Sequence, residues 1–330
     1  MKIEFDKRLE LIYGLIYCVD RDMNNKLHPG LCMSELPKYC DEFYSMYKNN
    51  VNEELVEYIK EYGINNNWIQ PAKIALSLDD NYNIVENDDL NHEIIISKNK
   101  KYNKVKVEKL LKDFVLNSNY DEFYNNHKPM YDKIIKSFKE SMNGCDAFNK
   151  DFFKNFYGYI LKEIVIKLYN FTSGSMGIIV GNYQYYIQRV DNIGKNEEQF
   201  MFKPKYINII HELSHPYILP YVNKYFDNID YSNLMDEAQK NGLPNCYVSK
   251  ERTWSIFNEY IVRAIAIYLG SKNDKHKKEL IDKEISNGFL YIEELVKLFD
   301  KKNNYDTFEE FFKNEIVNYC LTLSNDNLNK

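Results

Sequence analysis

The chain has 330 residues, of which 44% are hydrophobic and 28% are charged, and it contains only 12 glycines and 8 prolines. A chain this poor in turn formers is not a β-sandwich, barrel or propeller, because those folds need a turn roughly every ten residues. The net charge is -6, and the basic residues are spread along the chain rather than gathered in a stripe. We therefore expect a globular, mainly helical protein that does not bind nucleic acid.

The first residues of the sequence do not have the pattern of a targeting signal. The apolar run over residues 11–19 follows acidic residues and ends in Asp20-Arg21-Asp22, whereas a secretory signal needs a basic lead and a small-residue cleavage site. The longest uncharged stretch, residues 168–188, contains polar positions that a membrane span would not tolerate easily. The six cysteines form no C-x-x-C pair, so we expect free thiols. The sequence predicts a cytoplasmic protein with no membrane partner.

Amphipathic helices dominate the first half of the chain. Apolar residues recur at helical spacing over residues 4–19, 35–47, 53–62, 105–117 and 129–142. Residues 77–104 are rich in Asn, Asp and Lys, which predicts loops and a short hairpin around residues 94–96. We expect residues 1–155 to form a helical N-terminal region.

Composition changes in the middle of the chain. Five of the 12 glycines lie between positions 158 and 194, and the segments between them are β-branched and aromatic. This pattern predicts a small antiparallel sheet with strands over residues 160–171, 177–180 and 184–190. Helical periodicity then returns over residues 204–214, a second piece to 226, 232–241, 251–269, 275–286, 291–299 and 307–319. The predicted fold class is α+β, predominantly helical, with a second domain over residues 156–330.

Two of the six histidines fall in one pentapeptide, His211-Glu212-Leu213-Ser214-His215. With histidine this rare, a chance H-E-x-x-H is expected in about one such chain in a hundred. Positions i and i+4 of a helix share one face, so both imidazoles can bind one zinc ion. Glu212 is placed to reach the metal-bound water and is the predicted general base. It is the only charged side chain in residues 206–221, where an uncompensated carboxylate would be costly.

A catalytic zinc ion takes three protein ligands and one open position. The metzincin class is excluded, because its motif needs glycine at position 218 and histidine at position 221, where this chain has Ile218 and Tyr221. Residues 253–269 form a predicted apolar helix with only two charges, Glu259 and Arg263, at i, i+4 spacing. They are either a buried ion pair without a metal, or Arg263 holds one carboxylate oxygen while the other binds zinc. We take Glu259 as the third predicted ligand.

The motif, followed by Asn258-Glu259 on a second helix, resembles the gluzincin branch of the zincin metallopeptidases over about residues 158–270. The pattern Asn-Glu-x-x-x-Arg-Ala, the N-terminal Arg8-Leu9-Glu10-Leu11 and the Tyr-rich middle also resemble an uncharacterised group of bacterial H-E-x-x-H proteins of about this length. The gluzincin resemblance implies a zincin-like catalytic domain with Zn²⁺ as its cofactor. It also implies a peptide or protein substrate along an edge strand, for which residues 177–186 are the candidate.

Further features follow from the same resemblance. Gluzincins tend to use Tyr or His as the oxyanion donor, and Tyr247 between the two ligand helices is the candidate here. They often orient a histidine with a downstream acid, but Arg263 stands about where that acid is expected. Pro216 follows His215 directly, so we expect the motif helix to stop or bend there. The acids that the sequence leaves unranked for the orienting role are Asp236, Glu237 and Glu251.

These observations predict a zinc-dependent hydrolase, most simply a metallopeptidase. One alternative is a metal-binding or pseudo-enzymatic interaction protein in which the zinc ion only braces the fold. A closed shell of four protein ligands would favour that alternative, and an open fourth position would favour catalysis. Another alternative is a metal-free helical scaffold. The sequence does not define the oligomeric state or the substrate.

Overall fold

A computed structural model describes residues 2–22, 36–62, 69–85, 104–143, 151–171, 175–190, 202, 206–244 and 252–325. The chain divides into two compact units, of which the first holds Met1–Gly144 with Lys162–Pro204 and the second holds Cys145–Leu161 with Lys205–Lys330. The sequence predicts a division between residues 155 and 156, which would group the sheet with the motif helix. The sheet belongs to the first unit instead, because one of its strands comes from the N-terminus.

The first unit contains a four-stranded sheet with the order β1-β2-β4-β3. The pairs β1–β2 and β2–β4 are parallel, and β3–β4 is antiparallel. The sheet is therefore mixed rather than antiparallel, because β4 turns back from the β3–β4 hairpin to pair with β2. The strands are β1 (Lys2–Phe5), β2 (Glu163–Tyr169), β3 (Ser175–Val180) and β4 (Tyr183–Arg189). Residues 177–186, the candidate substrate strand, cover the edge strand β3 and part of the inner strand β4.

The N-terminal strand β1 was not expected, because the sequence predicts helix from residue 4. The helix begins later, at Lys7, since the Asp6 carboxylate accepts hydrogen bonds from the backbone N–H groups of Arg8 and Leu9 at 3.0 and 3.4 Å. Asp6 also pairs with Lys167 of β2, with 2.7 Å between Oδ2 and Nζ. The Asp6 side chain therefore caps the start of α1 and links the end of β1 to the neighbouring strand β2.

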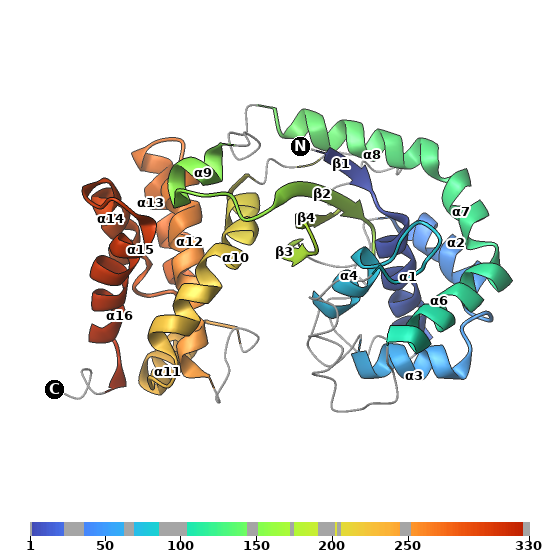
Figure 1. The fold of residues 1–330 in the computed structure, drawn as a ribbon, viewed down its shortest axis with the longest axis horizontal. Coiled ribbons are helices and arrows are strands. Elements are labelled where there is room, and N and C mark those ends of the chain that lie inside the picture. Colours follow the sequence, from blue (N-terminus) through green and yellow to red (C-terminus); the bar gives the residue numbers. More distant parts are fainter. Residues whose placement is uncertain are drawn as a thin grey trace. The chain divides into compact units, whose positions relative to one another are not determined.

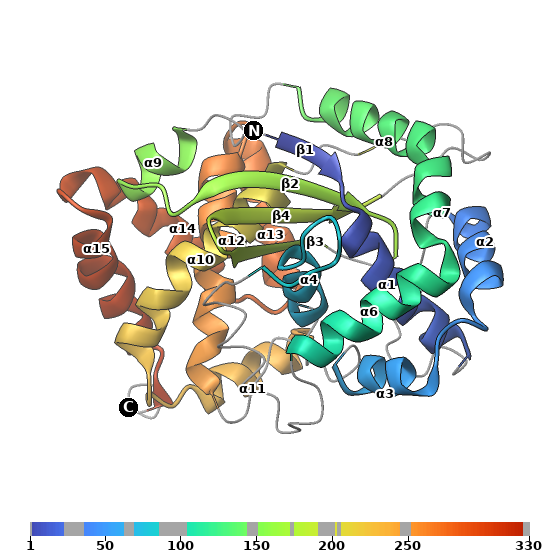
Figure 2. The same cartoon turned by 45° about the vertical axis from the view of Figure 1, so that its right-hand side comes forward.

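Seven helices are described in the first unit. They are α1 (Lys7–Asp22), α2 (Pro37–Tyr47), α3 (Glu53–Tyr62), α4 (Ile69–Leu76), α6 (Lys104–Ser118), α7 (Tyr120–Asn126) and α8 (Lys128–Ser141). The helix α8 lies along β1 and α4 lies beside β3, at the two edges of the sheet (Figure 2). The helices expected from periodicity are confirmed here, whereas α4 and α7 were not expected. The hairpin predicted around residues 94–96 lies outside the described residues.

The second unit is built from helices in its described residues (Figure 1). The longer ones are α10 (Tyr206–Phe226), α11 (Ser232–Lys240), α12 (Ile256–Gly270) and α13 (Asp274–Ser286). The shorter ones are α9 (Phe152–Tyr157), η3 (Thr253–Ser255), α14 (Ile292–Leu298), η4 (Phe299–Asn304), α15 (Phe308–Phe311), η5 (Phe312–Val317) and α16 (Asn318–Thr322). The predominantly helical α+β fold class is confirmed.

The motif helix α10 runs without interruption through Pro216 and Pro220. The sequence predicts that the helix stops or bends at the second histidine, and the first of these alternatives is therefore wrong. Its tertiary packing compensates for the hydrogen bonds that proline removes, since Leu213, Tyr217 and Ile218 are fully buried on both sides of Pro216. The motif histidines thus stand on one continuous helix.

The two longest helices of the second unit, α10 and α12, pack closely and run antiparallel. Gly270 at the end of α12 permits this approach, because a Cβ atom there would lie 2.3 Å from Ile207 Cδ1 near the start of α10. At the other end of the pair, residues near the start of α12 contact the motif histidines. The close packing fixes the side chains that project between the two helices.

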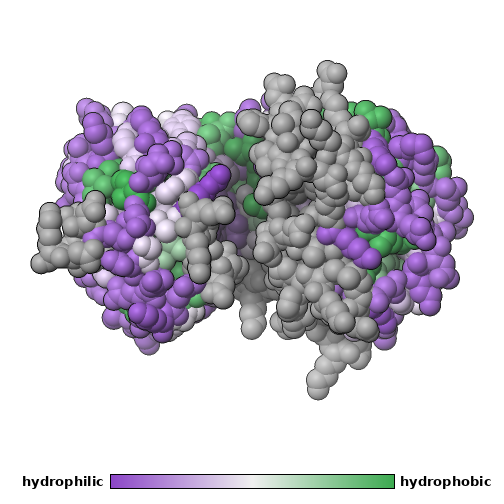
Figure 3. All heavy atoms as spheres, turned by 90° about the horizontal axis from the view of Figure 1, so that it is seen from below, coloured by the Kyte–Doolittle hydropathy of each residue, from purple (hydrophilic) through white to green (hydrophobic). Residues whose placement is uncertain are grey.

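The surface hydropathy, the helices and the cysteines can be compared with the features expected from the sequence. The described surface seen in Figure 3 is mostly hydrophilic, with small hydrophobic patches. None of the described helices combines the length and the apolar character that crossing a bilayer requires. Cys18, Cys40 and Cys320 are buried free thiols, as expected, and the other three cysteines lie outside the described residues.

Candidate metal centre

Two helices of the second unit bring the predicted ligands together. His211, Glu212 and His215 stand on α10, and Glu259 stands in the first turn of α12. Each of these side chains belongs to a residue that is neither fully buried nor fully exposed. The group is therefore partly accessible to solvent.

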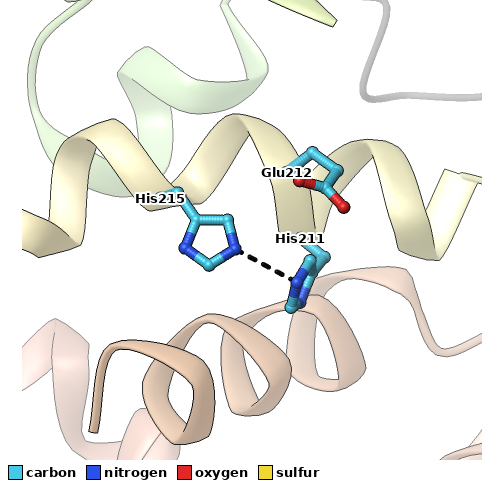
Figure 4. A group of neighbouring side chains, drawn as sticks. All are labelled: His211, Glu212 and His215. Atoms are coloured by element: carbon cyan, nitrogen blue, oxygen red, sulfur yellow. Dashed lines mark hydrogen bonds between the residues drawn. The ribbon is translucent and has the colours of Figure 1, made fainter. Parts of the chain in front are cut away.

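The two imidazole rings of the motif lie close together. His211 Nε2 and His215 Nε2 lie 3.2 Å apart, and the ring planes are nearly perpendicular at 87°. Figure 4 shows both rings projecting from α10 over the neighbouring helix, with Glu212 beside α10 rather than between the rings. The spacing expected from the H-E-x-x-H motif on a helix is therefore present.

The carboxylate of Glu259 lies against both rings. Its Oε1 is 3.5 Å from His215 Nε2, and its Oε2 is 3.7 Å from His211 Nε2. Two ligand atoms at about 2.0–2.1 Å from a tetrahedral zinc ion lie about 3.3–3.4 Å from each other. The two imidazole nitrogens are separated by about that distance, and each of them lies within 3.7 Å of a different oxygen of the Glu259 carboxylate.

The protonation state of the histidines suits metal binding. Burial lowers the pKa of His211 well below its usual value, and the nearby His215 ring and Arg263 guanidinium lower it further. Burial also lowers the pKa of His215, although the Glu259 carboxylate opposes that shift. Both rings are therefore neutral near pH 7, which is the form that binds metals.

The remaining ring nitrogen of His215 contacts Asn258. The amide Nδ2 lies 3.0 Å from His215 Nδ1, while Asn258 Oδ1 is buried without a hydrogen-bond partner among the described residues. The oxygen and nitrogen of an amide are assigned from the hydrogen-bond network, and exchanging them lets Oδ1 accept from Nδ1–H. That arrangement leaves the Nε2 lone pair free for a metal and satisfies the buried oxygen.

Arg263 connects Glu259 to a second acid. Its Nη2 lies 3.3 Å from Glu259 Oε2, and its Nη1 lies 2.8 Å from Glu284 Oε2 on α13. The guanidinium also stacks over the Phe289 ring at 4.3 Å. Glu259 Oε2 is buried and makes no hydrogen bond to any described residue, despite this ion pair. The carboxylate thus retains an acceptor position for a metal ion.

Glu212 also lies close to the two histidines. A carboxylate oxygen of Glu212 and one ring nitrogen of each histidine all lie within 4.8 Å of one another. This places the predicted general base near the metal centre without making it a necessary ligand.

The structure does not bring the other predicted site residues that it describes into the candidate metal centre. Tyr247 and Glu251 lie outside the described residues. Glu237 accepts a hydrogen bond from Tyr291, the residue before α14, at 3.1 Å, and Asp236 is exposed on α11. Sequence analysis does not single out Glu284, because it lies on another helix, 21 residues after Arg263, and its pairing with Arg263 depends on the tertiary fold.

The fold and the site define a predominantly helical α+β protein with a two-histidine, two-glutamate cluster on a pair of antiparallel helices. The chain belongs to the family described as "Domain of unknown function (DUF4932)", whose model matches residues 56–319 and so includes the whole cluster. A search of curated proteins finds no match, and a search of solved structures finds none either.

Proposed function

We propose that this protein is a zinc-dependent hydrolase, most simply a metallopeptidase, with His211, His215 and Glu259 as its zinc ligands. One observation carries the proposal: the two Nε2 atoms lie 3.2 Å apart, and oxygens of the Glu259 carboxylate lie within 3.7 Å of both. A hydrogen bond between the rings would account for the first distance alone. The approach of a carboxylate to two neutral imidazoles is better explained by a shared cation.

The residues around the cluster have distinct roles in this proposal. When bound, the zinc ion would supply Lewis acidity, which polarises a substrate carbonyl and lowers the pKa of a water molecule. Glu212 takes a proton from the attacking water and passes it to the leaving amine nitrogen. Asn258 orients His215, and Arg263 holds Glu259 in place.

A catalytic role is favoured over structural bracing. Structural zinc sites are usually closed by four protein ligands, chiefly cysteine and histidine. Within the part of the chain that the structure describes, the candidate group contains no cysteine and no third histidine. In this proposal Glu212 acts as the base and not as a fourth ligand, which leaves one position for water and substrate. The substrate class, a peptide or protein, and the cytoplasmic location both stay predictions from the sequence.

The proposal is tested by replacing the base without removing the ligands. Purified wild-type protein should contain about one zinc ion per chain by elemental analysis, and it should cleave members of a peptide library. Glu212→Gln should keep the zinc ion and lose at least about a hundredfold in hydrolysis, which is within the usual contribution of general base catalysis. Glu279→Gln, at an exposed acid of α13, is the matched control and should behave like wild type. Unchanged hydrolysis by Glu212→Gln would refute the proposal.

A further inference from the structure

A cavity of about 670 Å³ lies in the second unit, at the C-terminal end of α10. Its wall combines the end of α10, the turn that follows it and η3, the short helix that leads into α12. Asn223, Asp227, Arg252 and Trp254 contribute to the lining. Binding pockets for small ligands commonly have volumes of about 300–1,000 Å³, so this cavity can hold a long side chain.

The cavity lies on the same side of the helix pair as the metal centre. On α10, His215, Leu219 and Asn223 follow at intervals of four residues, which places them along one side of the helix. On the antiparallel partner, Trp254 precedes Asn258 by one turn, and Asn258 contacts His215. Eight residues of helix span about 12 Å, and Leu219 in between is 44% exposed. An exposed apolar side chain therefore lies between the metal centre and the cavity.

The polar groups of the cavity favour a cation. Asp227 and Asp230 contribute two carboxylates, against the single guanidinium of Arg252. Asp230 is held by Ser232, whose backbone N–H donates to Oδ1 at 2.9 Å. Asp227, by contrast, is exposed and forms no ion pair with a described residue. Half-buried Trp254 lines the cavity and stacks on no other described ring, and an indole face attracts cationic groups.

We propose that this cavity is a substrate subsite that receives a lysine or arginine side chain of a peptide. An extended peptide advances about 3.3 Å per residue, so 12 Å of helix corresponds to three or four residues from the bond that is cleaved. The cation would meet the carboxylate of Asp227 and the indole face of Trp254, and the peptide would pass over Leu219. This inference rests on the proposed peptidase function and names the substrate class of that site.

The binding experiment uses the only two tryptophans of the chain, Trp68 and Trp254. The zinc-loaded Trp68→Phe, Glu212→Gln double variant is titrated with matched peptides that carry lysine, alanine or glutamate at each of positions two to five from the bond cleaved in the library. Trp254 fluorescence reports occupation of the cavity. We expect the best lysine peptide to bind about tenfold more tightly than its alanine counterpart, with glutamate weakest.

Two changes at Asp227 test the charge argument. Asp227→Asn should reduce the preference for lysine to below about threefold, and Asp227→Lys should reverse it in favour of glutamate. Asp236→Asn, at an exposed acid of α11 outside the cavity lining, should keep the preference. Equal binding of the three peptides, tighter binding of glutamate peptides to the parent, or an unchanged preference in both Asp227 variants would each overturn the subsite.

Failure of the proposed function gives a different result from failure of the subsite. Wild-type protein that holds no zinc or cleaves no peptide contradicts the peptidase proposal, whatever the fluorescence shows. Wild-type protein that cleaves lysine, alanine and glutamate peptides with equal KM contradicts the subsite alone. A KM that rises about tenfold from lysine to alanine peptides, with little change in kcat, supports both.

Discussion

Asn258 contacts His215 on the ring nitrogen that faces away from His211, with 3.0 Å between Asn258 Nδ2 and His215 Nδ1. The sequence singled out Asn258 only as the neighbour of Glu259. In the proposed site it has a separate role, because a partner on Nδ1 fixes both the orientation of the ring and the nitrogen that carries the proton. Two adjacent residues of α12 therefore approach the motif histidines, Asn258 at Nδ1 of His215 and Glu259 at Nε2 of both rings.

We expect Asn258→Ala to lower zinc affinity by about 10- to 100-fold, which is the usual effect of removing a partner of a ligating histidine. Asn258→Asp, which keeps an acceptor for Nδ1–H, should recover most of that loss. Zinc affinity is measured by competition with a chromogenic chelator. Asn314→Ala, at an exposed position of η5, is the control. Equal affinities in the Asn258→Ala variant and the control would contradict the role given to Asn258.

Arg263 neutralises two carboxylates at once, and the side chains of Glu259 and Glu284 are only 19% and 15% exposed. We expect Arg263→Gln to destabilise the metal-free protein by about 3 kcal/mol, because both acids lose their cation. Glu284→Gln should cost less, and the double variant should recover part of the loss through a coupling of about 1 kcal/mol or more. Urea denaturation of the four proteins completes the cycle.

Zinc provides a second readout of the same ion pair. Bound zinc would replace part of the positive charge next to Glu259, so Arg263→Gln should destabilise the zinc-loaded protein less than the metal-free protein. Additive effects in the cycle, together with the same destabilisation in both metal states, would show that Arg263 acts only through packing against Phe289.

Sequence periodicity predicted most helices and the three strands between residues 160 and 190, because these patterns are local. The relative direction of the strands could not be predicted in this way, because it depends on contacts between distant segments. The parallel pairing of β2 with β4 depends on where the chain returns after the β3–β4 hairpin. The strand β1 has four residues, too few for a periodic pattern, and its partner lies about 160 residues away. The parallel pairing and the strand β1 could therefore be recognised only in the three-dimensional structure.

The arrangement of the candidate site was more predictable than that of its surroundings. The H-E-x-x-H spacing on a helix determines which residues share a face, so His211 and His215 could be paired from sequence alone. Glu259 was found because a charge in an apolar helix is unusual. Glu284 and Phe289 carry no such signal, since surface acids and core aromatics are common in this chain. Their contact with Arg263 arises only from the packing of α12 against the segments that follow it.

Gly288 and Gly158 offer a matched pair of backbone tests in the second unit. Both have positive φ angles, +91° and +86°. A Cβ atom at Gly288 would lie 2.5 Å from Leu243 N and 2.7 Å from Ala238 O, whereas nothing lies within 4 Å at Gly158. We expect Gly158→Ala to cost about 1–2 kcal/mol from backbone strain alone. Gly288→Ala should cost at least about 2 kcal/mol more, because the atoms it meets are backbone.

Denaturation midpoints of the two glycine variants give the comparison directly. Gly288 precedes Phe289, which stacks on Arg263, so zinc affinity should also fall in Gly288→Ala but not in Gly158→Ala. Equal destabilisation by the two substitutions would mean that the close approach to Leu243 relaxes without cost.

Glu10 gives the first unit a specific dependence on pH. Its side chain is fully buried in α1, where Asn170 donates to both carboxylate oxygens at 2.9 Å. Burial raises the pKa of Glu10 from 4.5 to about 7, and the hydrogen bonds from Tyr39 and Asn170 only partly oppose this shift. The folded protein therefore binds a proton that the unfolded chain has released between these two pH values. Stability contributed by Glu10 is complete below pH 4.5 and is lost as the pH rises to about 7.

The expected loss across that window is about 3 kcal/mol, because each pKa unit corresponds to about 1.4 kcal/mol. Glu10→Gln removes the titration, so the unfolding free energy of the variant should change less than that of wild type between pH 5 and pH 8. Glu122→Gln, at an exposed acid of α7, should keep the wild-type slope. Urea denaturation followed at several pH values measures the slopes. A Glu10→Gln slope equal to that of wild type would mean that Glu10 stays ionised in the folded protein, with its two Asn170 hydrogen bonds sufficient to offset burial.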